Sequence, residues 1–144
     1  MTSNKIDTAI ATIRAGGIIA IIDDGRAIPD IDVVMAGELL TEDTMVKMRT
    51  LAETDLYVPV SAQRLDDLQI NQQPPISIDP LARRTAFTET IGLTNNALDD
   101  TSDTSFITVV KALASADHHR DSFTSPGPVT AIRAGEGGGL RRLG

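Results

Sequence analysis

The sequence predicts a single domain, residues 1–144, that folds as an α/β or α+β sandwich. Short apolar segments of strand length alternate with segments whose apolar residues recur at helical spacing. This alternation is typical of helices packed on a sheet. Apolar residues make up 41% of the 144-residue chain, and aromatic residues only 3%. One core is therefore expected, built from Ile, Leu, Val, Ala and Met.

The first two elements are a helix and a strand. Apolar residues at helical spacing predict a helix that is capped by Thr2 or Ser3 and ended by Gly16-Gly17. The segment Gly17 to Ile22 is continuously apolar and β-branched, as expected of a strand covered on both faces. It runs directly into Asp23-Asp24. Ligands gather at the carboxyl ends of strands in open α/β sheets, so we expect a site there.

The remaining elements continue the alternation. We expect strands at 32–35, 56–60, 85–91 and 129–134. Helices are expected between them: one capped by Thr41, a short one capped by Ser61, and one opened by Asp103 or Thr104. The polar stretch from Gln69 to Pro75 is predicted to be a loop.

Composition excludes several classes of function. The net charge of −7 and the scarcity of aromatic residues argue against a nucleic-acid partner, which requires clustered Lys and Arg or stacking rings. The chain has no cysteine, so disulfides, thiolate nucleophiles and cysteine metal sites are excluded. The longest apolar run, Ile18 to Ile22, is far too short for a membrane span, and no signal-peptide core follows the N-terminus. We expect a cytoplasmic protein without membrane contact.

Several motifs occur in the order found in one enzyme family. The acidic loop from Asp23 to Asp32 continues without a gap into Val33-Val34-Met35-Ala36-Gly37-Glu38, and the tetrad Thr85-Ala86-Phe87-Thr88 and the pair Pro126-Gly127 follow. In this order and spacing the chain resembles the 3,4-dihydroxy-2-butanone 4-phosphate synthases of riboflavin biosynthesis over nearly its whole length. The resemblance implies a mixed β-sheet flanked by helices, C-terminally shortened here, and a homodimer.

The resemblance also implies the site. The family is a lyase that converts ribulose 5-phosphate into dihydroxybutanone phosphate and formate, with Mg²⁺ held by carboxylate and imidazole groups. Acidic residues that match the family's loop are the catalytic candidates: Asp23, Asp24, Asp30 and Asp32. Candidates for binding the substrate and its phosphate are Arg26, Thr88, Arg141 and Arg142.

Departures from the family pattern fall on residues that carry the chemistry. Ala27 and Ile28 stand where the family has arginine and a metal-binding glutamate. The sequence ends at Gly144, just before the position of the family's histidine ligand. Asp99-Asp100 replaces small and hydroxylic groups near the phosphate and would repel it. We therefore expect no metal-binding residues and no cofactor, with Mg²⁺ relevant only if residual family activity persists.

Three functions stay open at this stage. The first is a homodimeric scaffold or regulatory partner that lacks the magnesium-dependent conversion. The second is an enzyme of altered chemistry on a phosphorylated or carboxylated small molecule, with the Asp-rich loop transferring protons. The third is the authentic synthase. The expected partners are a second copy of the chain and a small phosphorylated ligand, and the same Asp-rich loop is equally compatible with a solvated turn.

Overall fold

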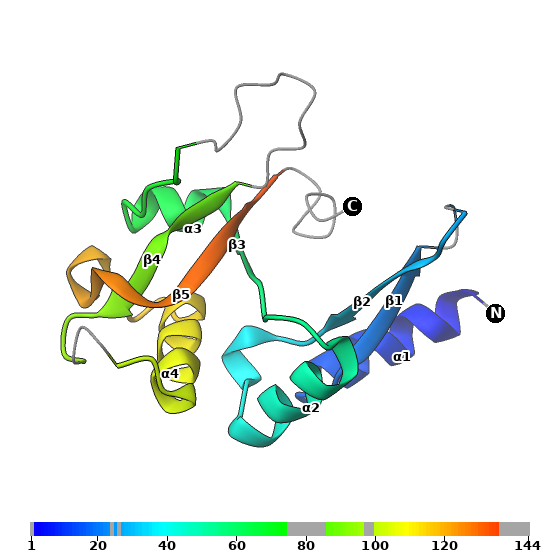
Figure 1. The fold of residues 1–144 in the computed structure, drawn as a ribbon. Coiled ribbons are helices and arrows are strands. Elements are labelled where there is room, and N and C mark those ends of the chain that lie inside the picture. Colours follow the sequence, from blue (N-terminus) through cyan, green and yellow to red (C-terminus); the bar gives the residue numbers. More distant parts are fainter. Residues whose placement is uncertain (1, 24, 26, 75–85, 97–99, 136–144) are drawn as a thin grey trace. The chain divides into compact units, whose positions relative to one another are not determined.

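The chain forms two compact units, Met1–Leu56 and Tyr57–Gly144. The computed structural model describes residues 2–23, 25, 27–74, 86–96 and 100–135 (Figure 1). Every helix within these ranges is too short or too polar to cross a membrane. Each unit is described separately, and the sequence-based expectation of a single domain stays a prediction.

The first unit is a two-stranded ribbon with helices before and after it. Its elements are α1 (Thr2–Arg14), β1 (Ile19–Asp23), β2 (Asp30–Val34), the 3-10 turn η1 (Gly37–Leu39) and α2 (Glu42–Ala52). The strands β1 and β2 pair antiparallel. Helix α1 lies against β1 and α2 against β2. Leu40 and Met45 are the buried apolar residues of this unit among those described.

Helix α1 ends where the sequence predicts. Gly16 adopts φ +77°, the left-handed conformation that glycine reaches without a Cβ penalty. Its N–H donates to the Ile13 carbonyl at 3.0 Å, and the N–H of Gly17 donates to the Thr12 carbonyl at 2.8 Å. These two bonds form the Schellman motif that satisfies the last carbonyls of a helix.

Helix α2 begins at the predicted cap. The Thr41 hydroxyl accepts from the Thr44 N–H at 3.2 Å, and the Thr44 hydroxyl accepts from the Thr41 N–H at 2.9 Å. This reciprocal capping box satisfies two donors that the first turn leaves without helical partners.

The expectation that β1 is covered on both faces is wrong. Ala20 is exposed, and 60% of Ile22 is accessible to solvent. Ile19 and Ile21 are half-buried, whereas Ala20 and Ile22 are exposed, so the first unit covers one face of the ribbon. A continuous apolar run fixes the extended conformation but does not establish how many layers cover it.

The second unit is a three-stranded mixed sheet with two helices. Its elements are β3 (Val58–Ser61), α3 (Ala62–Asp67), β4 (Phe87–Leu93), α4 (Asp103–Ala114), the 3-10 turn η2 (Arg120–Ser122) and β5 (Phe123–Ala134). The strand order is β3-β5-β4, with β3 parallel and β4 antiparallel to the central β5. The mixed sheet with helices confirms the predicted α+β class (Figure 1).

The core of this unit lies between α4 and the sheet. Helix α4 contacts β4 and β5, and α3 contacts β3 and β5. Five large apolar side chains here are essentially inaccessible to solvent: Leu65, Ile91, Val109, Val129 and Ile132. They come from four different elements, so the fold depends on contacts between segments far apart in the sequence.

Strand β5 is longer than predicted, because it begins at Phe123 and not at Val129. Its first half contains Pro126, Gly127 and Pro128, residues that usually mark turns. The pairing with β4 shifts register between Ile91 and Gly92, so the strand continues through an irregularity. A Cβ on Gly127 would overlap the backbone of Gly92, and only glycine permits this close approach.

Candidate functional site

Three of the predicted catalytic aspartates share one face of the β1–β2 ribbon. Asp23 is paired directly with Asp30, and Asp32 is paired with Ile21. Directly paired residues point to the same side of a ribbon, and so do residues two apart on one strand. Asp23, Asp30 and Asp32 therefore lie on one face, while Ile22 and Ile31 lie on the other.

The ribbon positions this group at its open end. Asp23 and Asp30 are both exposed, and opposed side chains of this kind have Cβ atoms about 5 Å apart. The Asp23 carboxylate also accepts from the Gly25 N–H at 3.1 Å, which fixes it against the turn. Asp32, one step further along, is half-buried. Carboxylates on neighbouring strands can together bind a cation.

The turn that joins the strands carries an aliphatic side chain. Ile28 is 83% exposed, the most exposed of the large apolar residues described. It offers no lone pair to a cation and no hydrogen bond to a sugar. Within the described ranges, no three side chains of His, Asp, Glu or Cys come together in a way that could hold a metal ion. The Asp23–Asp30 pair is thus the part of this ribbon best suited to a hard cation, with few protein ligands.

Four predicted site residues lie outside the part of the chain that the structure describes. They are Asp24, Arg26, Arg141 and Arg142. Their predicted roles in catalysis and phosphate binding stay predictions.

Thr88 belongs to the second unit and lies within β4. It is fully buried. Its hydroxyl accepts from the Ala131 N–H at 3.0 Å and donates to the Glu89 carbonyl at 2.8 Å. The β4–β5 pairing is irregular between Phe87 and Thr90, so this hydroxyl serves the Ala131 amide in place of a backbone carbonyl. To donate to a phosphate, the hydroxyl would have to give up its bond to the Glu89 carbonyl and become accessible, and the phosphate-binding role of Thr88 stays a prediction.

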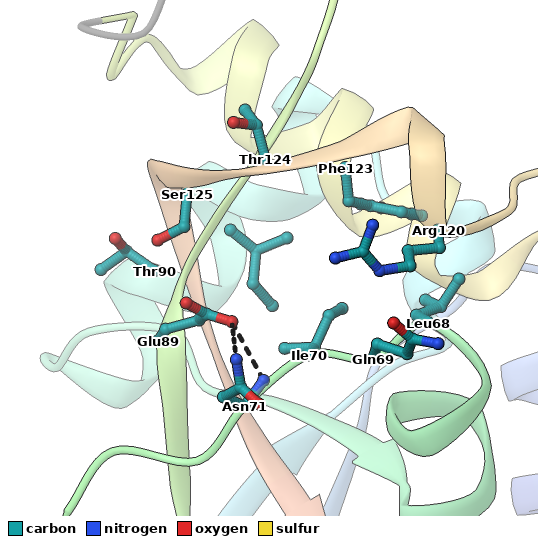
Figure 2. A pocket seen from close by; sticks show the side chains of 11 residues that line it. Leu68, Gln69, Ile70, Asn71, Glu89, Thr90, Arg120, Phe123, Thr124 and Ser125 are labelled. Carbon is teal, nitrogen blue, oxygen red and sulfur yellow. Dashed lines mark hydrogen bonds between the residues drawn. The ribbon is translucent and has the colours of Figure 1, made fainter.

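A hollow in the second unit contains polar residues that the sequence did not single out. Figure 2 shows the Glu89 carboxylate and the Arg120 guanidinium pointing into it from opposite sides. Glu89 and Arg120 are 31 positions apart in the sequence, counting from 89 to 120, so no local pattern joins them.

The loop that leads to Arg120 is fastened by Arg64 of α3. The Arg64 guanidinium donates to the carbonyls of Leu113, Ser115 and His118 at 3.1, 2.5 and 2.9 Å. Leu113 lies in the last turn of α4, where carbonyls lack helical partners and a cation is favourable. His118 is half-buried against Phe123, and His119 is exposed. The pair therefore does not present two imidazoles to one ion.

An ion pair ties α3 to the central strand. Arg133 of β5 donates to both carboxylate oxygens of Asp66 at 2.8 and 2.7 Å. The hydrogen bond to Arg133 is the main reason that the pKa of Asp66 is lowered, and the bond to Asp66 raises the pKa of Arg133. Bidentate geometry of this kind fixes both side chains in orientation.

Comparison with curated proteins gives relatives in one pathway. The riboflavin biosynthesis protein RibBA of Mycobacteroides abscessus is 30% identical over 141 residues, which are 98% of this chain and 33% of the relative. The protein of the same name from Mycobacterium tuberculosis shows the same identity and coverage. This chain spans about a third of the length of these relatives.

Comparison with solved structures gives the same fold. The 3,4-dihydroxy-2-butanone 4-phosphate synthase of Candida albicans matches with a TM-score of 0.72 and 25% identity, covering 92% of this chain and 63% of that chain. A synthase solved in complex with two magnesium ions matches with a TM-score of 0.75 and 24% identity, covering 96% of this chain and 64% of that chain.

A family model gives the most direct result, because it covers nearly the whole sequence. The model described as 3,4-dihydroxy-2-butanone 4-phosphate synthase matches residues 7–144. The resemblance seen in the sequence is thereby confirmed: this chain belongs to the 3,4-dihydroxy-2-butanone 4-phosphate synthase family of riboflavin biosynthesis.

Proposed function

We propose that this chain acts in riboflavin biosynthesis as a cytoplasmic, homodimeric scaffold or regulatory partner, with little of the magnesium-dependent conversion of ribulose 5-phosphate. The observation that carries the proposal is Ile28, an exposed aliphatic side chain at the tip of the acidic ribbon. The family resemblance assigns this position to a metal-binding glutamate.

The ribbon keeps two paired aspartates, but it offers few further ligands for a cation. Mg²⁺ prefers six oxygen ligands in octahedral order and is usually held by one or two carboxylates together with substrate oxygens and water. Asp23 and Asp30 offer such a pair, and a similar structure was solved with two magnesium ions. Ile28 places an exposed aliphatic side chain where the family resemblance puts a carboxylate. A cation held here would be weakly bound and poorly positioned for two sugar oxygens.

Exposed apolar side chains on the first unit support homodimerisation. Six large aliphatic residues of this unit are each more than half exposed: Ile6, Ile22, Ile28, Ile31, Val46 and Leu51. Ile22 and Ile31 are paired across the ribbon and make its second face apolar. Apolar side chains on one face of a ribbon are suited to contact with a protein partner. A second copy of the chain would cover this apolar face and would agree with the homodimer that the family resemblance implies.

Measuring the release of formate tests the proposal directly. The purified chain is incubated with ribulose 5-phosphate and Mg²⁺, and released formate is quantified beside a synthase that matches the family pattern at position 28. Because a correctly placed catalytic group contributes about 100-fold or more, we expect formate release to be lower by at least about that factor. Formate release equal to that of the reference enzyme would show that the chain is an authentic synthase and overturn the proposal.

A second candidate is an enzyme of altered chemistry on a phosphorylated or carboxylated small molecule. It is favoured by the shared face of Asp23, Asp30 and Asp32, since grouped carboxylates can transfer protons without a metal ion. Thermal-shift measurements with sugar phosphates separate it from the scaffold role.

For these measurements the informative variant is Asp30→Asn, and its matched control is Asp55→Asn, an exposed loop residue of the same unit. Stabilisation by a sugar phosphate that Asp30→Asn abolishes and Asp55→Asn keeps would favour the altered enzyme. A flat response in all variants, with a dimer in light scattering, would favour the scaffold.

A further inference from the structure

The hollow in the second unit has an apolar floor and polar walls. It has a volume of about 260 Å³ and is lined by residues that follow α3, by β4, by η2 and by the start of β5. Leu68, Ile70 and Ile91 lie at its base and are almost inaccessible to solvent. Thr90, Thr124 and Ser125 also line it. A volume of this size suits a metabolite smaller than a typical drug molecule.

Glu89 is held in place on one wall. One carboxylate oxygen, Oε1, accepts from both the backbone N–H and the side-chain amide of Asn71, at 3.0 and 3.2 Å. The Glu89 N–H in turn donates to the Asn71 carbonyl at 2.9 Å. Among the described residues, no hydrogen bond falls on the other oxygen, Oε2. The carboxylate is therefore oriented before a ligand arrives, with one oxygen left to accept.

Arg120 stands on the opposite wall (Figure 2). Its closest ion contact within the described residues is with Asp121 at 4.0 Å, between side chains that are 60% and 100% exposed. A pair at that distance in water contributes little. The backbone around Arg120 is fixed, because the Ser122 N–H donates to the His119 carbonyl at 2.9 Å and Arg64 binds the His118 carbonyl. The Arg120 guanidinium can therefore bind an anion, and the backbone that carries it is held in place.

The two charges face the same hollow but do not pair with each other in the described structure. We propose that this hollow binds a small zwitterion, such as a free amino acid, with its ammonium group on Glu89 and its carboxylate on Arg120. An ionised carboxylate accepts hydrogen bonds and cannot donate, so Glu89 requires a donor, and an ammonium group supplies both donors and charge. Arg120 requires an anion, for which a carboxylate is a planar match.

Ligands with one kind of charge fit less well. A simple phosphate or carboxylate would gain Arg120 but face the negative Glu89, and a simple amine would gain Glu89 but face Arg120. The carbon chain between the charged groups of a zwitterion would lie over Ile70 and Ile91, where apolar surface is favourable. The hollow is open to solvent, so the expected dissociation constant is about 1 mM.

NMR titration of the full chain tests the inference. The probes are glycine, β-alanine, γ-aminobutyrate and ε-aminocaproate, which vary the separation of the two charges, with butanoate and butylamine as singly charged controls. We expect one length to shift the amide signals of residues 89–91 and 120–125, and the singly charged controls to bind at least about tenfold more weakly.

Two variants separate this site from a general charge effect. Glu89→Gln keeps an acceptor for Asn71 but removes the charge, and Arg120→Gln removes the cation. Each is expected to weaken zwitterion binding at least about fivefold. Asp121→Asn, which removes the neighbouring charge outside the hollow, and Lys111→Gln on α4 are the matched controls and should leave the affinity unchanged.

Three results would contradict zwitterion binding in the hollow. No signal shift with any zwitterion at about 10 mM, ten times the expected dissociation constant, would overturn the inference. Zwitterion binding by Glu89→Gln and by Arg120→Gln that is as tight as binding by the wild type would do the same. Ribulose 5-phosphate is titrated as a separate arm: shifts at residues 89–91 and 120–125 that exceed those of every zwitterion would assign the hollow to a sugar phosphate. Failure here would leave the formate result at the acidic ribbon unaffected.

Discussion

Thr88→Val is the change with the clearest structural consequence. Valine has nearly the volume of threonine, so the variant leaves no cavity, but it removes the hydroxyl that joins Ala131 to β4. Thr88 and Ala131 are both fully buried, so water cannot replace the lost partner. The variant therefore isolates the contribution of one hydroxyl to the mixed sheet.

The magnitude follows from the groups left without partners. The Ala131 N–H loses its acceptor, and the Glu89 carbonyl loses a donor at 2.8 Å. A buried donor without a partner costs about 1–3 kcal/mol. Valine's greater hydrophobicity offsets a fraction of this, so we expect the free energy of unfolding to fall by about 2 kcal/mol. For a unit of this size, that corresponds to a melting temperature lower by on the order of 10 °C.

Urea denaturation and thermal melting measure the effect. Thr88→Ser, which keeps the hydroxyl, should restore the donor and acceptor and lose only a methyl group. Thr108→Val is the matched control, because its hydroxyl donates to the Thr104 carbonyl at an exposed helical position, and it should change stability by less than about 0.5 kcal/mol. If Thr88→Val also stays within about 0.5 kcal/mol, the hydroxyl is not structural, and the phosphate contact suggested by the family resemblance becomes the better explanation of Thr88.

Two further changes test the electrostatics of the second unit. Arg64→Gln removes the guanidinium from the carbonyls at the end of α4 and should lower the free energy of unfolding by about 2 kcal/mol in urea titrations. The control is Lys47→Gln at an exposed helical position, which should leave the free energy of unfolding unchanged. An equal effect of both variants would refute the role of Arg64. Because Arg133 lowers the pKa of Asp66 in the folded state, the pair stabilises the fold above the unfolded-state pKa of about 4, and this contribution is lost as the pH falls through the lowered folded-state value. Urea titrations from neutral to acidic pH should show the wild type more stable than Asp66→Asn at neutral pH and the difference disappearing in acid; a difference that grows as the pH falls would contradict the assignment.

Local signals in the sequence predicted the elements well. Thr41 and Ser61 cap helices as expected, and Gly16-Gly17 ends the first helix, because these residues act on backbone groups within a few positions. The order of strands and helices followed from apolar spacing. These features need no knowledge of distant contacts.

Features that depend on distant contacts were not predictable in the same way. Placing a site after Gly17 to Ile22 assumed an open α/β sheet, yet β1 pairs antiparallel with β2, and the acids lie at the end of a ribbon. The early start of β5 was hidden by Pro126 and Gly127, whose irregular pairing depends on Gly92. The hollow between Glu89 and Arg120 forms only when the sheet brings three separate segments of the chain together.

The acidic ribbon is the central element of this account, and magnesium binding to it is the most direct measurement. Calorimetric titration of Mg²⁺ into the purified chain is compared with the same titration of Ile28→Glu, which restores a carboxylate at the tip beside Asp23 and Asp30. We predict weak binding by the natural sequence and at least about tenfold tighter binding by Ile28→Glu, since Mg²⁺ affinity rises with the number of oxygen ligands. Tight binding by the natural sequence, unchanged in Ile28→Glu, would contradict the claim that position 28 limits the site.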